Sequence, residues 1–378
     1  MAVLTEEQSL LKDQARSWVS EVAPVKKFRE MRDSGIDVGF EPATWQGMVE
    51  MGWTGILIPE ALGGSDLGYL TFGLVLEETG RQLTASPLLA SALAGASALL
   101  LGGSEAQQRA WLPKVVDGSA ILALAVDEGP KHAPSAVALK AERSGNGFRL
   151  TGRKTFVAEG GAATALVVAA RTSGSPGERD GITLFLVDAN ARGVTRRKLR
   201  TADSRGYANI DFDAVEVGAD AVLGEVDRGF AVLDATLDRA RAGLAAEMLG
   251  TAAQAFEMTL DYLKTRKQFG QVIGSFQALG HRAAAMYTKL ELTRSCVEAA
   301  LQAIDNRADN IAEMCSLAKY KGGELLHLVS NELIQIHGGI GMTDEFDAGF
   351  YLKRARAAEA LFGNQTFHRN RYAELLGF

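Results

Sequence analysis

The sequence predicts an α+β protein in which a helical segment, a β-rich segment and a second helical segment follow one another along 378 residues. From Thr5 to about Val116, apolar residues recur every three or four positions, as amphipathic helices require. Between about Ala120 and Val222, short apolar and β-branched runs alternate with turn residues. After Gly229 the helical spacing returns and continues almost to the end. We therefore expect three domains: an N-terminal helical domain at 1–117, a middle β domain at 118–225 and a C-terminal helical bundle at 226–378.

In the first segment, Thr5 followed by Gln8 has the spacing of a capping box that opens a helix. A loop is expected over Leu57–Gly64, and a further helix from about Leu70 to Arg81. In the middle segment, short strands separated by glycine-rich turns predict an antiparallel barrel or sandwich. The strands we expect are Ile121–Leu124, Phe148–Leu150, Ala165–Val168 and Ile182–Val187.

In the last segment, an apolar stripe predicts a helix from Phe230 to about Gln268, with Gly270 as its C′ residue. Three more long helical stretches follow, so the segment should form an antiparallel four-helix bundle. These stretches lie at about 276–306, 310–337 and 345–360. No βαβ repeat is present, which argues against a Rossmann-type dinucleotide site.

Composition excludes several functional classes. The net charge is −6 and the Lys and Arg residues are scattered, which argues against nucleic acid as a partner. Two cysteines, Cys296 and Cys315, favour a reducing compartment, and neither they nor the five histidines have metal-ligand spacing. No stretch is apolar and long enough for a membrane span, and the N-terminus lacks an export signal. We expect no metal site, no membrane association and a cytoplasmic protein.

Three motifs point to a ligand, although each has a simpler explanation. The first motif is Gln335 followed by Gly338 and Gly339. The two glycines could let a pyrophosphate approach backbone N–H groups. The simpler explanation is a turn between two helices. Arg266 and Phe269 end a helix, where the arginine could pair with a diphosphate or simply complement the helix C-terminus. Asp238 and Arg241 lie one turn apart, as polar hooks for a ligand or as an intrahelical ion pair.

Together the motifs resemble those of the acyl-CoA dehydrogenase family over essentially the whole chain. Arg266, Phe269 and Gln277 match its R-x-x-F-G…Q signature, and Gln335, Gly338 and Gly339 match its Q-x-x-G-G signature. The N-terminal P-E-x-x-G-G…E-E-x-x-R stretch of the family is similar to Pro59-Glu60, Gly63-Gly64, Glu77-Glu78 and Arg81.

This resemblance implies the family's fold, FAD as cofactor, an acyl-CoA thioester as substrate, and α,β-dehydrogenation as the reaction. It implies that the six residues of the two C-terminal signatures contact the diphosphate and adenine of an FAD held mainly by the neighbouring subunit. It assigns the CoA moiety to Asp238 and Arg241, and an aromatic wall beside the flavin to Phe156. It also implies a dimer or a dimer of dimers formed through the C-terminal bundle.

The chain departs from the family at the reactive end of the site. In most family members the catalytic Glu stands 23 residues after the second glycine of Q-x-x-G-G, where this chain has Phe362. In a minority of members the Glu stands directly before the arginine of the first bundle helix, where this chain has Ala240. No catalytic base can therefore be named. The flavin-binding T-E-P-x-x-G-S-D is replaced by a stretch beginning Asp127-Glu128-Gly129-Pro130, and K-x-W-I-T by Lys154–Ala158.

This pattern resembles the Glu-lacking small subunit of heteromeric bacterial acyl-CoA dehydrogenases, such as pimeloyl-CoA dehydrogenase. Such a subunit would lend its adenine-end residues to FAD seated in a Glu-bearing partner, in a heterotetramer. Three alternatives remain: a substitute acid such as Glu247, a β-elimination in which Arg81 orients an anionic acyl group, and a non-catalytic acyl-CoA- or FAD-binding subunit. The sequence also leaves a homodimer or homotetramer open, and does not reveal the acyl chain.

Overall fold

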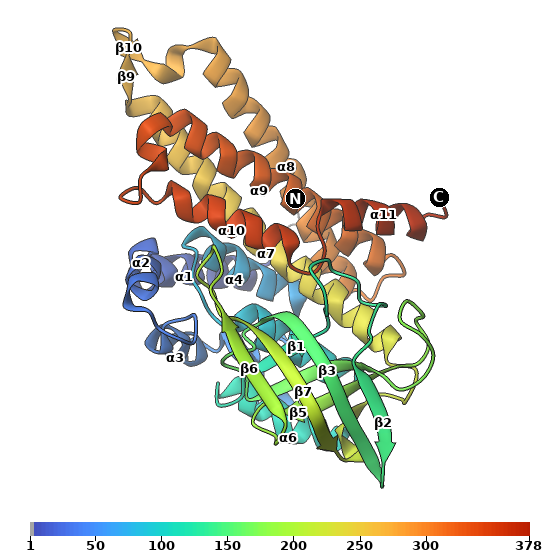
Figure 1. Cartoon of the computed structure of the whole chain (residues 1–378). Coiled ribbons are helices and arrows are strands. Elements are labelled where there is room, and N and C mark those ends of the chain that lie inside the picture. The colour runs from blue at the N-terminus through green and yellow to red at the C-terminus, as the bar shows by residue number, and fades with distance from the viewer. Residues whose placement is uncertain (1–3) are drawn as a thin grey trace. The chain divides into compact units, whose positions relative to one another are not determined.

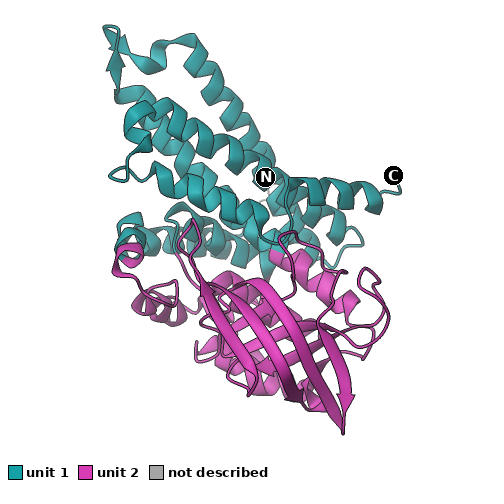
Figure 2. Ribbon diagram, viewed as in Figure 1, with its two compact units in different colours: residues 1–30, 69–84, 241–378 teal, residues 31–68, 85–240 magenta. Residues whose placement is uncertain are grey.

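The structure is a computed structural model that describes residues 4–378. The chain forms two compact units, each assembled from separated stretches (Figure 2). Unit 1 contains residues 4–30, 69–84 and 241–378, and unit 2 contains residues 31–68 and 85–240.

The N-terminal helices begin where the sequence predicts. The first helix, α1 (Glu6–Val22), opens with the expected capping box, in which Thr5 accepts from Gln8 N–H and the Gln8 side chain accepts from Thr5 N–H. The helix expected from Leu70 is α4 (Gly68–Arg81), which is buried on all sides. The other helices of this segment are α2 (Val25–Ser34), α3 (Pro42–Glu50), α5 (Ala96–Gly102) and α6 (Glu105–Val116), with the short helical turns η1 (Trp53–Gly55), η2 (Glu60–Leu62) and η3 (Leu88–Gly95).

The bundle helices α7 to α10 run alongside one another in unit 1, which contains α7 from Arg241 onward (Figure 1). They are α7 (Phe230–Thr265), α8 (Gln277–Asp305), α9 (Ile311–His337) and α10 (Ala348–Ala360), followed by α11 (Gln365–Leu375), which we did not predict. The helical connectors are η5 (Ile273–Ser275) and η6 (Gly338–Met342). Among residues 4–378, no helix combines the length and hydropathy of a bilayer span.

The predicted end of the first bundle helix was wrong. The helix stops at Thr265, and β9 (Lys267–Gln268) and β10 (Gln271–Val272) form a hairpin in place of its last turn. Phe269 and Gly270 are the two central residues of that hairpin turn, with φ of 52° and 79°. Positive φ at both positions is the signature of a type I′ turn, so Gly270 is a turn residue and not a helix C′ residue.

Unit 2 is organised around one curled β-sheet, whose strands follow the order β6-β7-β3-β2-β4-β5-β8, with β1 paired to β4. Side chains from both ends of this order share one core, and Phe148 of β3 contacts Phe185 of β5 edge to face at 5.1 Å. The strands are β1 (Leu122–Ala125), β2 (Lys140–Ser144), β3 (Gly147–Ala158), β4 (Ala165–Arg171), β5 (Ile182–Asp188), β6 (Val194–Leu199), β7 (Tyr207–Val217) and β8 (Val222–Leu223), with η4 (Ala219–Ala221) before the last.

Two features of the sheet differ from the prediction. Strand β1 pairs with β4 in parallel, as does the end of β2, so the sheet is mixed and not purely antiparallel. Strands β2, β6 and β7 were not predicted. They are rich in charged residues because one face of each is exposed, whereas β1 and β4 are buried on both faces.

Candidate functional site

The β9–β10 hairpin of unit 1 presents two of the predicted cofactor residues to solvent. Phe269 is 91% exposed at the tip of the hairpin, so its ring is accessible to a ligand or a partner. Arg266 is exposed too, and no carboxylate in residues 4–378 lies within ion-pair distance of it. Gln277 is exposed at the first position of α8. These three side chains come from one short stretch of chain and are all accessible.

The Q-x-x-G-G turn follows α9 and is open on its outer side. Gln335 is exposed on the last turn of the helix. Gly338 has φ 63° and ψ −133°, a conformation that only glycine adopts readily. A Cβ built on Gly338 or on Gly339 meets nothing within 4 Å, so a ligand can reach the backbone there.

The structure brings these two motifs together within unit 1. Tyr262, four residues before Arg266, stacks on His337 with ring centroids 4.1 Å apart, and its hydroxyl donates to the His337 carbonyl at 3.5 Å. Phe346 covers another part of the His337 ring at 4.7 Å. Burial lowers the pKa of His337, so its ring acts as a neutral aromatic wall. The ends of α7 and α9 therefore lie beside each other, and an exposed arginine after one helix and an open glycine backbone after the other fit a nucleotide diphosphate.

In unit 2, the two stretches predicted to face the flavin ring are adjacent. The Thr155 N–H donates to the Asp127 carbonyl at 2.7 Å, and the Lys154 ammonium donates to Glu128 Oε1 at the same distance. Lys154 is fully buried, and this burial lowers its pKa despite the neighbouring carboxylate. The Lys154–Glu128 pair therefore fixes the start of the loop after β1 against β3.

Phe156 lies at a bulge of β3 and points outward. Its φ is 50°, the pairing register with β7 shifts between Lys154 and Val157, and its side chain is 56% exposed. Bulges commonly re-aim a side chain next to a functional site. The ring is therefore available as an aromatic wall, while Ala158 supplies no hydroxyl beside it.

The nearby Asp127 is not an exposed replacement for the missing polar residues. One of its carboxylate oxygens lies 2.8 Å from His132 Nδ1, and the other accepts from the Ala133 N–H at 3.1 Å. These contacts lie within the loop after β1, so the Asp127 carboxylate is already hydrogen-bonded there. The cofactor residues thus fit FAD best at the adenine and diphosphate end, and the flavin end offers fewer polar contacts.

In this chain, buried hydrocarbon side chains occupy both positions at which the family places its catalytic carboxylate. Ala240 is fully buried in α7, and Phe362 is 7% exposed in the turn between α10 and α11. Phe362 has φ 57°, a left-handed conformation that is strained for a bulky residue. Neither side chain can accept a proton.

Three polar side chains of unit 1 fix the backbone of this turn. Arg241 Nε donates to the Phe362 carbonyl at 3.3 Å, and His368 Nε2 lies 3.0 Å from the same oxygen. Lys319 Nζ donates to the carbonyls of Gly363 and Ala358, each at 3.0 Å. Burial lowers the pKa of Lys319 to about 7. Sequence reasoning missed Lys319; a lysine on the apolar face of α9 was the available signal.

The predicted substrate residues are inaccessible in this structure. Asp238 is 4% exposed and Arg241 is fully buried, with its guanidinium also 5.4 Å from the ring of Phe367. A CoA contact by either residue stays a prediction. Arg241 donates a hydrogen bond to the carbonyl of Phe362 and so stabilises that turn.

The two other candidates for an altered chemistry are engaged in ion pairs. Glu247 is 4% exposed and accepts from Arg354 Nη2 at 2.8 Å, which is the environment of a packing residue and not of an accessible base. Arg81 is 8% exposed, with Glu257 at 2.9 Å and Glu78 at 3.4 Å. Within residues 4–378 no group of three acidic, His or Cys side chains could hold a metal ion.

Comparison with known proteins shows the family of this chain. Three family models match consecutive parts of the chain: the acyl-CoA dehydrogenase N-terminal domain at 5–119, the middle domain at 127–215 and the C-terminal domain at 227–377. The caffeyl-CoA reductase–Etf complex subunit CarC of Acetobacterium woodii is 33% identical over 90% of each chain. The chain belongs to the acyl-CoA dehydrogenase family.

Solved structures of the family have the same fold. The Tcur3481–Tcur3483 steroid ACAD, solved as a variant, is 32% identical with a TM-score of 0.88 over 98% of each chain. The ChsE4–ChsE5 complex of Mycobacterium tuberculosis is 29% identical with a TM-score of 0.90, covering 100% of this chain and 99% of that one. The predicted acyl-CoA dehydrogenase fold is therefore confirmed, and membership supports an oxidoreductase acting on CH–CH bonds with FAD.

Proposed function

We propose that this protein is the base-lacking subunit of a heteromeric, FAD-dependent acyl-CoA dehydrogenase. The observation that carries the proposal is the pair of buried hydrocarbon residues, Phe362 and Ala240, at the two positions of the family's carboxylate. A positioned base typically accelerates such a proton transfer by roughly 10²–10⁴-fold. Dehydrogenation at a site built from this chain alone would lack that contribution.

The chain keeps the residues that a second subunit would need from it. Arg266 can pair with the FAD diphosphate, and Phe269 and Gln277 can contact the adenine side. The backbone at Gly338 and Gly339, reached past Gln335, can donate N–H groups to the phosphates. Because these residues are exposed, they are available across a subunit boundary.

The α-proton of the thioester would be removed by a carboxylate of the partner subunit, in which this FAD is seated, since none is available at Phe362 or Ala240. FAD, when bound, supplies the acceptor for the hydride that leaves the acyl chain. In a site seated in this chain, as the homo-oligomeric alternative requires, Phe156 would cover one face of the flavin ring. Asp238 and Arg241 would act on the substrate side of that site, Arg241 through the Phe362 turn that it contacts.

Several relatives support a partner subunit of unlike sequence. CarC is named as a subunit of a caffeyl-CoA reductase–Etf complex, and two of the similar structures carry paired names, Tcur3481–Tcur3483 and ChsE4–ChsE5. A heterotetramer with a Glu-bearing family member would be the analogous assembly, and a homodimer or homotetramer the alternative. The ion pairs of Arg81 give no support to a β-elimination in which this residue orients an anionic acyl group.

Co-expression with a Glu-bearing family member from the same genome tests the proposal. We expect equal amounts of both chains in one particle, bound FAD, and turnover of an acyl-CoA that neither chain supports alone. Replacing Arg266 with alanine in this chain should lower the FAD content of the assembly. Full FAD occupancy and turnover by the isolated chain would refute the proposal.

A further inference from the structure

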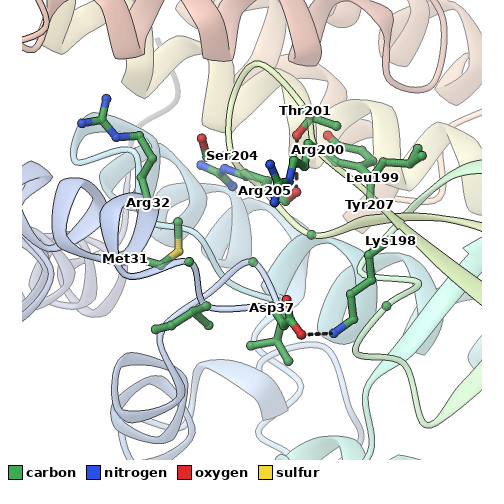
Figure 3. Close-up of a pocket in the computed structure, with 16 residues that line it drawn as sticks. Met31, Arg32, Asp37, Lys198, Leu199, Arg200, Thr201, Ser204, Arg205 and Tyr207 are labelled. Atoms are coloured by element: carbon green, nitrogen blue, oxygen red, sulfur yellow. Dashed lines mark hydrogen bonds and ion pairs between the residues drawn. The ribbon is translucent and has the colours of Figure 1, made fainter.

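Unit 2 contains a pocket of about 580 Å³ that includes none of the residues assigned to FAD or acyl-CoA. Its walls are the connector between α2 and α3 and the connector between β6 and β7 (Figure 3). Pockets that bind small molecules commonly have volumes of about 300–1,000 Å³. The pocket is therefore large enough for a ligand of nucleotide size.

The charged side chains that line the pocket are mostly cationic. They are Arg32, Lys198, Arg200 and Arg205, against the single carboxylate of Asp37. The Ser204 hydroxyl, on the same connector as Arg200, adds a neutral donor (Figure 3). An excess of cations with a hydroxyl donor favours an anionic ligand.

The ion pairs that Lys198 and Arg32 make at the pocket involve carboxylates that are more than half exposed. Lys198 lies 3.5 Å from Asp37, whose side chain is 86% exposed. Arg32 pairs with Asp33, which is 57% exposed. Arg200 is exposed and makes no ion pair with any carboxylate in residues 4–378. Exposed pairs contribute little because water screens them, so a multivalent anion can compete for these cations.

The wall that carries Arg200 is well ordered by buried contacts. The Thr201 hydroxyl donates to Asp203 at 2.7 Å, and Asp203 is 3% exposed. The Glu159 N–H donates to the Gly206 carbonyl at 2.6 Å. Because this connector is fixed, the guanidinium of Arg200 starts from a defined backbone position, which lowers the entropy lost on binding.

We propose that this pocket binds a phosphate-bearing small molecule, with Arg200 and Lys198 as the principal contacts. Arginine and lysine are the side chains that most often bind phosphate oxygens, arginine in a bidentate manner. Asp37 opposes the ligand by pairing with Lys198. The proposal is independent of the function assigned above, because the two sites share no residue.

Calorimetric titration of the full chain with inorganic pyrophosphate tests this site. We expect saturable binding that weakens from low to high salt. The Arg200→Ala variant should bind about tenfold more weakly, since a charge-assisted contact is lost. Arg192→Ala removes another exposed arginine, which lies outside the pocket, and should have no effect. Asp37→Asn should bind more tightly, because the competing carboxylate is gone.

A parallel titration with ADP identifies the source of the phosphate. Binding of ADP that is tighter than that of pyrophosphate, and still weakened by Arg200→Ala, assigns the pocket to a nucleotide. Equal affinities assign it to an inorganic or other simple phosphate. Absence of pyrophosphate and ADP binding, or binding that Arg200→Ala leaves unchanged, overturns the proposal.

Discussion

Two turns of unit 1 each follow a long helix, and they have opposite designs. The turn after α9 is exposed and carries two glycines with open space beside them, and His337 before it stacks on Tyr262 of α7. The turn after α10 is buried, carries Phe362 in a left-handed conformation, and has its carbonyls bonded to Arg241, His368 and Lys319.

This difference separates two roles that the family normally combines in one chain. The first turn is open to a ligand and depends little on its neighbours. The second turn holds a fixed backbone, and the side chain of Phe362 cannot accept a proton. Substitutions at the second turn should therefore change stability, and substitutions at the first should change cofactor binding.

The largest expected effect is on the buried ion pair that ties α10 to α7. Arg354→Met removes an ion-pair partner of Glu247, which is 4% exposed, and should destabilise the protein by about 3–5 kcal/mol because a buried carboxylate loses that charge contact. Shifts of the urea unfolding transition measure this. Lys289→Met breaks an exposed pair with Glu324 and should cost less than about 1 kcal/mol. Equal losses in the two variants would contradict the view that α10 is anchored by buried charge.

Lys319 should make stability depend on pH. Its pKa in the folded protein is about 7, whereas a lysine in the unfolded chain keeps its proton up to about pH 10.4. Between these values the unfolded state binds more protons, so raising the pH stabilises the folded state, by at most about 1.4 kcal/mol per pH unit. Unfolding measured from pH 7 to 9 should show this rise in the wild type, and Lys319→Met should remove it. A rise of the same size in the variant would assign it to other groups.

Alanine substitutions at Gly338 and Gly339 distinguish the effect of backbone strain on stability from the effect of a blocked ligand site on FAD binding. Gly338→Ala must adopt φ 63° and ψ −133°, at a cost of about 1–3 kcal/mol. Gly339→Ala meets open space at an ordinary φ and should leave stability unchanged. Both should weaken FAD binding by the assembly, because a methyl group enters the space that the phosphates need. If Gly339→Ala binds FAD normally, the diphosphate does not lie against this backbone.

The smallest effect on stability is expected at Phe269. Its side chain is 91% exposed at the hairpin tip, so Phe269→Ala should unfold like the wild type. FAD should bind the variant assembly about tenfold more weakly, since one aromatic contact is worth roughly 1 kcal/mol or more. Fluorescence titration of the apo assembly with FAD measures this. A loss of stability without a loss of FAD affinity would contradict the assignment of ligand binding to the exposed hairpin and turn.

The order of helices and strands could be predicted because it depends on local periodicity. The capping box at Thr5 and the long helices α8 and α9 follow from patterns within a few turns of the chain. The hairpin at Phe269 and Gly270 could not be predicted, because Arg266–Gly270 satisfies the rules for a helix C-terminus equally well. Strands β6 and β7 were missed because their exposed faces carry charged residues.

The candidate site was only partly accessible from the sequence. Exposure of Arg266, Phe269 and the glycines agrees with a ligand site, while their contacts with FAD stay predictions. The ties of Arg241 and Lys319 to the Phe362 turn join residues more than 40 positions apart in sequence. Such contacts arise from the packing of α7, α9 and α10, which no local pattern encodes. The same holds for the pocket lined by Arg200 and Asp37.

The absence of a base is tested most directly by exchange of the α-hydrogen of an acyl-CoA thioester in heavy water, with the isolated chain in the presence of excess FAD. The account predicts exchange no faster than in buffer alone, and catalysed exchange once the Glu-bearing partner is added. Rapid exchange by the isolated chain would show that a proton acceptor other than residues 240 and 362 serves this site, and would contradict the account.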